Sequence, residues 1–281
     1  MKKIYYLIII AAIFFDCSIV HADSVESYRK FCTLTGLYDT EEGEISSHLY
    51  GHLAVDYAVE ILKENPNSIE ACEIVELVTR TLNDDKTKDF YNKLKEKHMP
   101  NFDDPDFEPA EKIIFLSMLR CGIEAKNLEE NKQYQLLANK GFINMKDNCM
   151  NSDYAALATK GLFKNKSNEE RLMYKKYFLE KYPQHKHIPH IKQSIINELY
   201  CENNPQKCIE ELLKLAEQYK NLSTPHGWRI VMDYYCDIAY TYRDLKDFEN
   251  AKKYYYMIEK EVPNYWNLKY LKPRLFPESN D

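Results

Sequence analysis

Apolar residues recur along this chain at intervals of three and four positions, the spacing that places side chains on one face of an α-helix. No stretch sustains the strict alternation of a half-buried strand, and glycine is scarce, with 7 in 281 residues. The clearest stripes are Ala54, Tyr57, Ala58, Ile61 and Leu62; Ile74, Val75 and Val78; Ile114, Met118 and Cys121; and Ile209, Leu212, Leu213 and Ala216. The pattern predicts an all-α fold.

Residues that cap or stop helices divide the chain into segments of similar length. Asn, Asp and Ser bond to free backbone groups at helix ends, and Pro stops a helix because it lacks a donor. Breaks of this kind fall at Asn65-Pro66-Asn67, Met99-Pro100-Asn101, Tyr182-Pro183, Asn203-Asn204-Pro205 and Val262-Pro263, among others. We expect helix pairs near 25–64, 67–98, 107–141, 150–182, 187–220 and 226–261, with a short closing helix around Tyr265 to Leu271. Hairpins of such regular length indicate internal repetition.

A motif near the C-terminus combines aromatic and small residues at regular spacing: Tyr235, Ile238-Ala239, Tyr242, Ala251, Tyr255 and Pro263. The small residues allow two helices to approach closely, and the tyrosines fill the angle between them. Lys246-Asp247 is the expected turn, with Asp247 as the helix N-cap. In residue class and spacing the motif resembles the tetratricopeptide repeat, with residues 232–265 as the best repeat.

Elsewhere the resemblance rests on spacing. Pro66 and Pro100 stand 34 residues apart, which is the family period, and Pro183 and Pro263 stand 80 apart, or two longer units. The resemblance implies an α-solenoid of antiparallel helix pairs, a tetratricopeptide-like superhelix, over residues 23–281, with 264–281 as the C-terminal cap and tail. Such hairpins stack because one pair cannot bury its apolar face alone, and the curved stack leaves a concave surface.

The same resemblance implies recognition of a protein or peptide partner by the first helix of each pair. In the last repeat the family register places Asp233, Asp237, Tyr240 and Arg243 in or near the concave groove. One repeat earlier, the corresponding residues are His190, Gln193, Asn197 and Tyr200. We expect these eight side chains to contact the partner.

The N-terminus has the anatomy of a cleaved secretory signal. Lys2 and Lys3 precede an apolar run from Ile4 to Phe15, which is shorter than the about 20 residues that span a membrane. Val20-His21-Ala22 suits a signal peptidase. We therefore expect residues 1–22 to be removed after Ala22 and the mature chain to be periplasmic or secreted, without stable membrane insertion. A retained N-terminal anchor is the alternative.

The net charge limits the classes of partner, and the cysteines indicate where a disulfide can form. The formal net charge is -6, which argues against nucleic acid as a partner. Cys201 and Cys208 flank a predicted turn between helices and are the best candidates for a disulfide. Cys72, Cys121 and Cys236 fit equally well as small buried residues in helices.

Three histidines, His185, His187 and His190, cluster around Pro189 and could hold zinc or copper. No acidic or cysteine ligand stands close to them in sequence, and the chain has no Gly-rich phosphate loop, Gly-x-Ser-x-Gly motif or CxxC. We therefore expect no enzyme activity, no metal and no cofactor, and predict an exported protein-binding scaffold or adaptor. The alternatives are a helical-array enzyme or metal-binding periplasmic protein that uses the three histidines, or a periplasmic immunity or inhibitor protein.

Overall fold

The computed structural model describes residues 44–79, 85–99, 108–149, 152–164, 166–224 and 227–276. Within these ranges the regular secondary structure is helical and contains no β-strand, so the predicted all-α class is confirmed. The α-helices are α2 (Glu44–Glu64), α3 (Ile69–Val78), α4 (Asp85–His98), α5 (Pro109–Arg120), α6 (Leu128–Asn148), α7 (Ser152–Gly161), α8 (Asn168–Lys181), α9 (Ile188–Ile196), α10 (Pro205–Gln218), α11 (Val231–Asp244), α12 (Phe248–Glu261) and α13 (Leu268–Leu275), and a π-helical turn η1 (Asn197–Cys201) follows α9.

The predicted signal peptide, the first helix of the pair near 25–64 and the end of the C-terminal tail lie outside the described residues. Where the prediction can be compared, three details differ. The second helix of the pair near 107–141 continues to Asn148, because Phe142 and Met145 extend its buried face. The closing helix begins at Leu268 and not at Tyr265, whose amide instead donates to the Val262 carbonyl in a turn. Leu213 is 38% exposed, so it does not belong to the buried stripe of α10.

The chain divides into two compact units, one containing residues 52–138 and the other containing residues 139–281. In the first unit α3 and α4 both pack against α5, which is buried on nearly all sides. Cys72 of α3 is fully enclosed, and burial raises the pKa of its thiol, so it behaves as a small apolar residue. Cys121, at the end of α5, is only half-buried.

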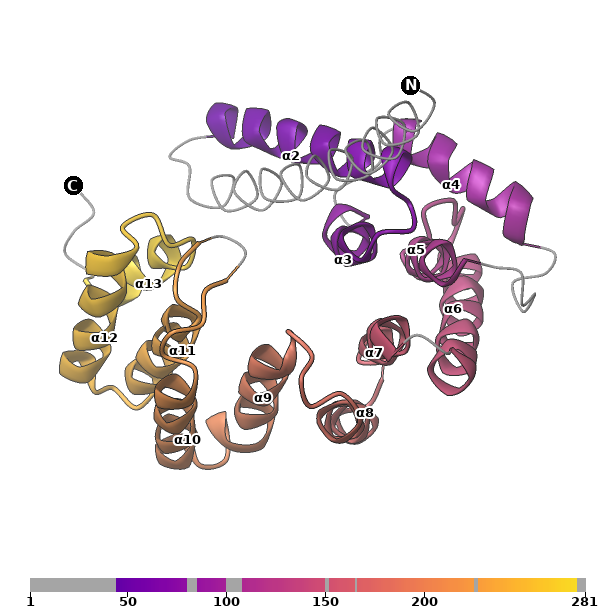
Figure 1. Cartoon of the computed structure of the whole chain (residues 1–281). Coiled ribbons are helices and arrows are strands. Elements are labelled where there is room, and N and C mark those ends of the chain that lie inside the picture. Colours follow the sequence, from indigo (N-terminus) through magenta and orange to yellow (C-terminus); the bar gives the residue numbers. More distant parts are fainter. Residues whose placement is uncertain are drawn as a thin grey trace, which may run out of the picture. The chain divides into compact units, whose positions relative to one another are not determined.

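In the second unit, helices that follow one another along the chain also pack against one another. The contacts join α7 to α8, α8 to α9, α9 to α10, α10 to α11, α11 to α12 and α12 to α13. Figure 1 shows α10, α11 and α12 side by side in orange and yellow. Their shared core includes Leu212, Tyr234, Ile238 and Ile258, each with no exposed surface.

Two segments of this unit repeat each other at a distance of 80 residues. Helix α8 spans 168–181 and α12 spans 248–261, and each begins after a side-chain N-cap, Ser167 and Asp247 respectively. The turns that follow have the same hydrogen bonds: His185 donates to the Tyr182 carbonyl as Tyr265 does to that of Val262. The helices after the turns, α9 and α13, begin at 188 and 268. The eighty-residue spacing of Pro183 and Pro263 therefore marks a repeat in the backbone itself.

The hairpin of α11 and α12 is closely packed. Ala239 and Ala251 have no exposed surface, as expected for small residues where two helices meet, and Asp247 caps α12 by accepting from the amide of Asn250. The tyrosines differ in one respect from the prediction. It is Tyr254, and not Tyr255, whose ring contacts those of Tyr235 and Tyr242, at centroid distances of 5.5 and 5.9 Å.

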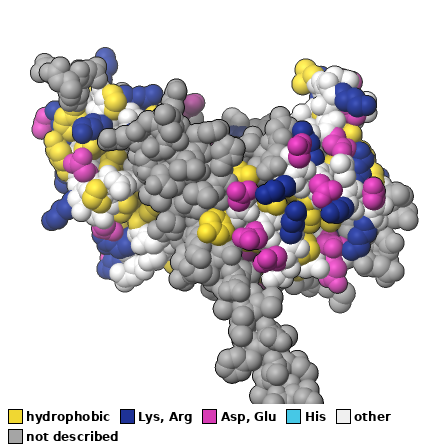
Figure 2. Space-filling model, turned by 90° about the horizontal axis from the view of Figure 1, so that it is seen from above, with side chains coloured by type: hydrophobic (Ala, Val, Ile, Leu, Met, Phe, Trp, Pro, Cys, Tyr) yellow, Lys and Arg dark blue, Asp and Glu magenta, His cyan; other side chains and the backbone are white. Residues whose placement is uncertain are grey.

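The surface that is visible in Figure 2 carries Lys and Arg side chains interspersed with Asp and Glu. Elsewhere in the described helices, oppositely charged residues one turn apart pair along a single helix, such as Lys93 with Asp89 and Lys214 with Glu211. Exposed pairs of this kind contribute little to stability, so the face is best described as a mixed, solvated surface. Among the described helices, none combines the length and the hydropathy that crossing a membrane requires.

Candidate functional site

Five of the eight predicted contact residues meet between α9–η1 and α11. Gln193 Nε2 donates to Asp237 Oδ2 at 2.7 Å, and Asn197 Nδ2 donates to the same oxygen at 2.6 Å. One turn earlier, His190 Nδ1 lies 4.0 Å from Asp233 Oδ2. The paired residues are 40 to 44 positions apart in sequence, which is about half of the eighty-residue repeat.

The carboxyl of Asp237 accepts both of these hydrogen bonds. Burial raises the pKa of its carboxyl above the ordinary value, and the hydrogen bonds from Asn197 and Gln193 lower it in part. Both donors are neutral amides that bond to Oδ2, so the negative charge is stabilised by hydrogen bonds and not by a cation. A carboxylate held in this way keeps a strong capacity to accept further hydrogen bonds.

The other carboxylate of α11, Asp233, is engaged differently. Its Oδ1 accepts a hydrogen bond of 2.6 Å from the hydroxyl of Tyr265, in the turn before α13. Burial and the neighbouring Asp233 raise the pKa of the Tyr265 hydroxyl, so Tyr265 stays a neutral donor. Asp233 thus ties α11 to the following turn.

The remaining predicted residues separate into two groups. The Arg243 guanidinium lies against the Tyr240 ring, 4.8 Å from its centre, and pairs with the Asp244 carboxylate. Tyr200 is half-buried against the core of α10 to α13, and the structure does not place it with the other contact residues in the pocket described next.

A pocket of about 610 Å³ opens at the C-terminal ends of η1 and α11. Three predicted residues, Asn197, Asp237 and Tyr240, line it. Its other lining residues are Cys201, Glu202, Pro205, Thr241, Asp244 and Leu245. The sequence singled out Cys201 only for the disulfide and none of the six as a contact residue. Helical spacing could have indicated some of them, because Cys201 lies four residues after Asn197, and Thr241 four after Asp237. Glu202 comes from the turn and Pro205 from the start of α10, and the pattern does not predict the path of the chain between η1 and α10.

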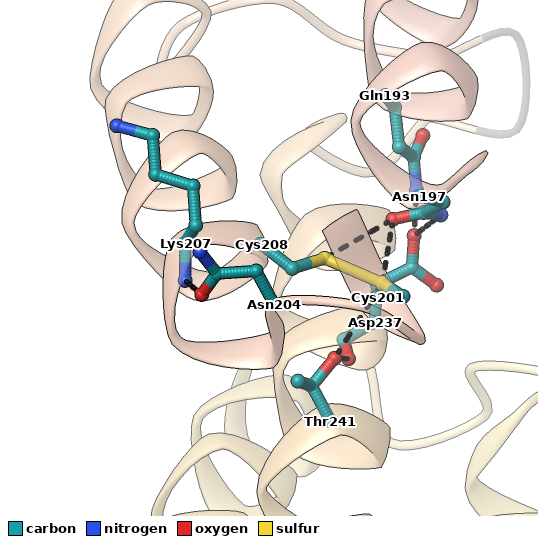
Figure 3. Close-up of a disulfide and its surroundings, with 8 residues drawn as sticks. All are labelled: Gln193, Asn197, Cys201, Asn204, Lys207, Cys208, Asp237 and Thr241. Atoms are coloured by element: carbon teal, nitrogen blue, oxygen red, sulfur yellow. Dashed lines mark hydrogen bonds between the residues drawn. A yellow bond between two sulfur atoms is a disulfide. The ribbon is translucent and has the colours of Figure 1, made fainter. Parts of the chain in front are cut away.

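Cys201 and Cys208 form a disulfide beside this pocket (Figure 3). It joins the last residue of η1 to the first turn of α10. The carboxamide of Asn197 lies between the disulfide and Asp237: its Oδ1 is 3.4 Å from Cys201 Sγ and 3.8 Å from Cys208 Sγ, while its Nδ2 points to Asp237. Because disulfide sulfurs carry no hydrogen, the two contacts to Oδ1 are packing contacts.

The chain has no match among protein-family models, curated proteins or solved structures. Its function has to be argued from this pocket and from the arrangement of the helices that form it.

The histidine cluster lies away from the pocket. The rings of His185 and His187 are 5.1 Å apart, and His187 Nε2 is 3.3 Å from Lys160 Nζ. His190 belongs instead to the Asp233 side of α11. In the part of the chain that the structure describes, no three His, Cys, Asp or Glu side chains are grouped so that they could hold a metal ion.

Proposed function

We propose that the chain is an exported protein-binding scaffold whose mature part is an α-solenoid of antiparallel helix pairs. Three observations support the solenoid: consecutive helices of the second unit pack in order, α9 and α11 meet through residues about 40 apart, and α8 and α12 repeat at a spacing of 80. The resemblance of residues 232–265 to a tetratricopeptide repeat supports the same architecture. In such arrays the first helices of successive pairs line the binding face.

The observation that carries the proposal is the pocket at the ends of η1 and α11. Glu202, Asp237 and Asp244 line it together with Tyr240. Of these, Asp244 already pairs with Arg243, whose guanidinium lies against the Tyr240 ring. Asp237 is already oriented by two amide donors, so a bound group would not have to order it. A partner segment with hydrogen-bond donors, in particular a lysine or arginine side chain, would complement this lining.

The metal-binding alternative has less support. His185 and His187 lie together, but His187 Nε2 lies 3.3 Å from the ammonium of Lys160, and an ammonium is not a metal ligand. His190 lies beside Asp233. An immunity or inhibitor protein would be one form of the proposed scaffold, distinguished by the identity of its partner.

A displayed library of random peptides, selected on the purified mature chain, tests the proposal. We expect the selected peptides to share lysine or arginine and to bind Asp237→Asn about tenfold or more weakly, because a hydrogen bond to a charged group contributes about 1.5 to 3 kcal/mol. The substitution preserves the shape of the side chain and an acceptor for Asn197 and Gln193, so it should leave the fold intact.

Glu217→Gln is the matched control. Glu217 is an exposed carboxylate on α10 that pairs with Lys220 and is not part of the pocket. Its substitution should leave peptide affinity unchanged. If no peptides are selected, or if the selected peptides bind Asp237→Asn as tightly as the wild-type protein, the pocket is not the binding site.

A further inference from the structure

The turn that carries Asn197 is not secured by burial. Every residue of η1 keeps some exposed surface, although π-helical turns are less stable than α-helix and persist where their surroundings hold them. Its N-terminal half is anchored to α8, because Glu198 Oε1 accepts hydrogen bonds of 2.6 Å from both Arg171 and Lys175. Its C-terminal residue, Cys201, is anchored by the disulfide to Cys208.

Cys208 is the fixed end of that bond. It has no exposed surface, belongs to the core shared by α10 to α13, and follows a helix start that is capped by the side chain of Asn204. Cys201 is only partly buried and lines the pocket. The disulfide thus ties a partly exposed turn, which forms one wall of the pocket, to a rigid helix.

Asn197 links this bond to the carboxylate. Its Oδ1 packs against both sulfurs, and this orientation directs Nδ2 at Asp237. A dithiol that reduces the bond transfers two electrons to it and closes to its own disulfide. The S–S bond breaks, and each sulfur takes up a proton. The two new thiols are no longer held together and can each donate to Oδ1, so the surroundings that orient the amide change.

We propose that the Cys201–Cys208 disulfide is a redox-sensitive crosslink that maintains the shape of the pocket between η1 and α11. In the oxidised chain Cys201, Glu202 and Asn197 are held in place and Asp237 accepts both amides. In the reduced chain the C-terminal half of η1 is released, so Cys201 and Glu202 leave their places in the pocket wall and the contacts at Asn197 Oδ1 change. The bond from Gln193 to Asp237, which comes from α9 ahead of the turn, is kept. This regulation acts on the site of the proposed function, but its test requires no partner.

Hydrogen–deuterium exchange of the full mature chain, oxidised and after treatment with dithiothreitol, measures the release directly. We expect backbone amides of residues 199–204 to exchange about tenfold or more faster after reduction, while those of α8 and α12 keep their rates. Nuclear magnetic resonance should show the side-chain amide signals of Asn197 moving while those of Gln193 stay. The four other described cysteines are unpaired, so the reductant has no further described disulfide to act on.

The double variant Cys201→Ala, Cys208→Ala is the control. It should exchange like the reduced wild-type protein with and without dithiothreitol. Unchanged exchange of residues 199–204 in the reduced wild-type protein would overturn the proposal. So would an equal acceleration across α8, α10 and α12, because the disulfide would then stabilise the whole unit and not the pocket. If the oxidised chain bound no peptide, that result would contradict the proposed function and would leave this redox proposal unaffected.

Discussion

Asp237 is one of three acidic residues that line the pocket, and it accepts two amide hydrogen bonds from the facing helix and turn. The family register suggested by the sequence places it on the binding face, and the structure places it opposite Gln193 and Asn197. The sequence alone placed Gln193 and Asn197 on one face of their helix, because helical spacing determines which side chains share a face. Their hydrogen bonds to Asp237 could not be predicted, since these depend on how two helices some 40 residues apart are placed against each other.

Asp237→Asn should stabilise the protein near neutral pH. Burial raises the folded-state pKa above that of the unfolded chain, about 3.9. Near neutral pH the folded protein therefore bears the full cost of a buried carboxylate. This destabilisation decreases as the pH falls through the raised pKa of Asp237 in the folded protein, and it is absent below a pH of about 3.9. The variant should unfold at a higher urea concentration at about pH 7, and its advantage should shrink at about pH 4.5.

Urea unfolding followed by far-ultraviolet circular dichroism, at both pH values, measures this difference. Asp244→Asn is the control, since Asp244 lies on the same pocket but its side chain is 65% exposed. Its unfolding midpoint should change little with pH relative to the wild-type protein. If Asp237→Asn is the less stable protein at neutral pH, the carboxylate is better stabilised than its two amide partners explain.

At the scale of helices, the sequence predicted where helices begin and end better than it predicted the conformation of the turns between them. Asp247 is confirmed as the N-cap of α12, and the predicted break at Tyr182-Pro183 coincides with the end of α8. These features follow from local chemistry, which a sequence displays. The π-helical turn η1 was not predicted, because a single widened turn changes the helical period over too few residues to appear in the apolar pattern.

Ser167→Ala tests the cap that corresponds to Asp247 and lies 80 residues before it. Ser167 Oγ accepts from the Glu170 amide, and the Glu170 carboxylate accepts from the Ser167 amide, forming a capping box at the start of α8. Removing the hydroxyl should lower the free energy of unfolding by about 1 kcal/mol. Denaturant unfolding gives the value.

Lys176→Ala, on an exposed position in the middle of α8, is the comparison. Surface changes of this kind stay within about 0.5 kcal/mol. An equal effect of the two substitutions would show that the start of α8 is held by packing and not by its cap.

At the scale of the whole chain, the apolar period and the helix-breaking residues were sufficient to predict the all-α class of the described residues and the ends of many of their helices. The eighty-residue repeat was visible in two prolines and extends to two helices, their caps and the turns that follow. Export, the solenoid and the binding role remain predictions. The pocket could not have been predicted as a whole, because its lining combines one helix face with a turn that the disulfide shapes.

Site-specific photo-crosslinking tests the binding account most directly. A benzophenone amino acid replaces Tyr240, which lines the pocket, or Tyr256, which is 52% exposed on α12, in the full chain produced in its own cells. The account predicts that light yields one discrete protein adduct from position 240, that position 256 yields none, and that Asp237→Asn abolishes the adduct. No adduct from position 240, or the same adduct from both positions, would contradict it.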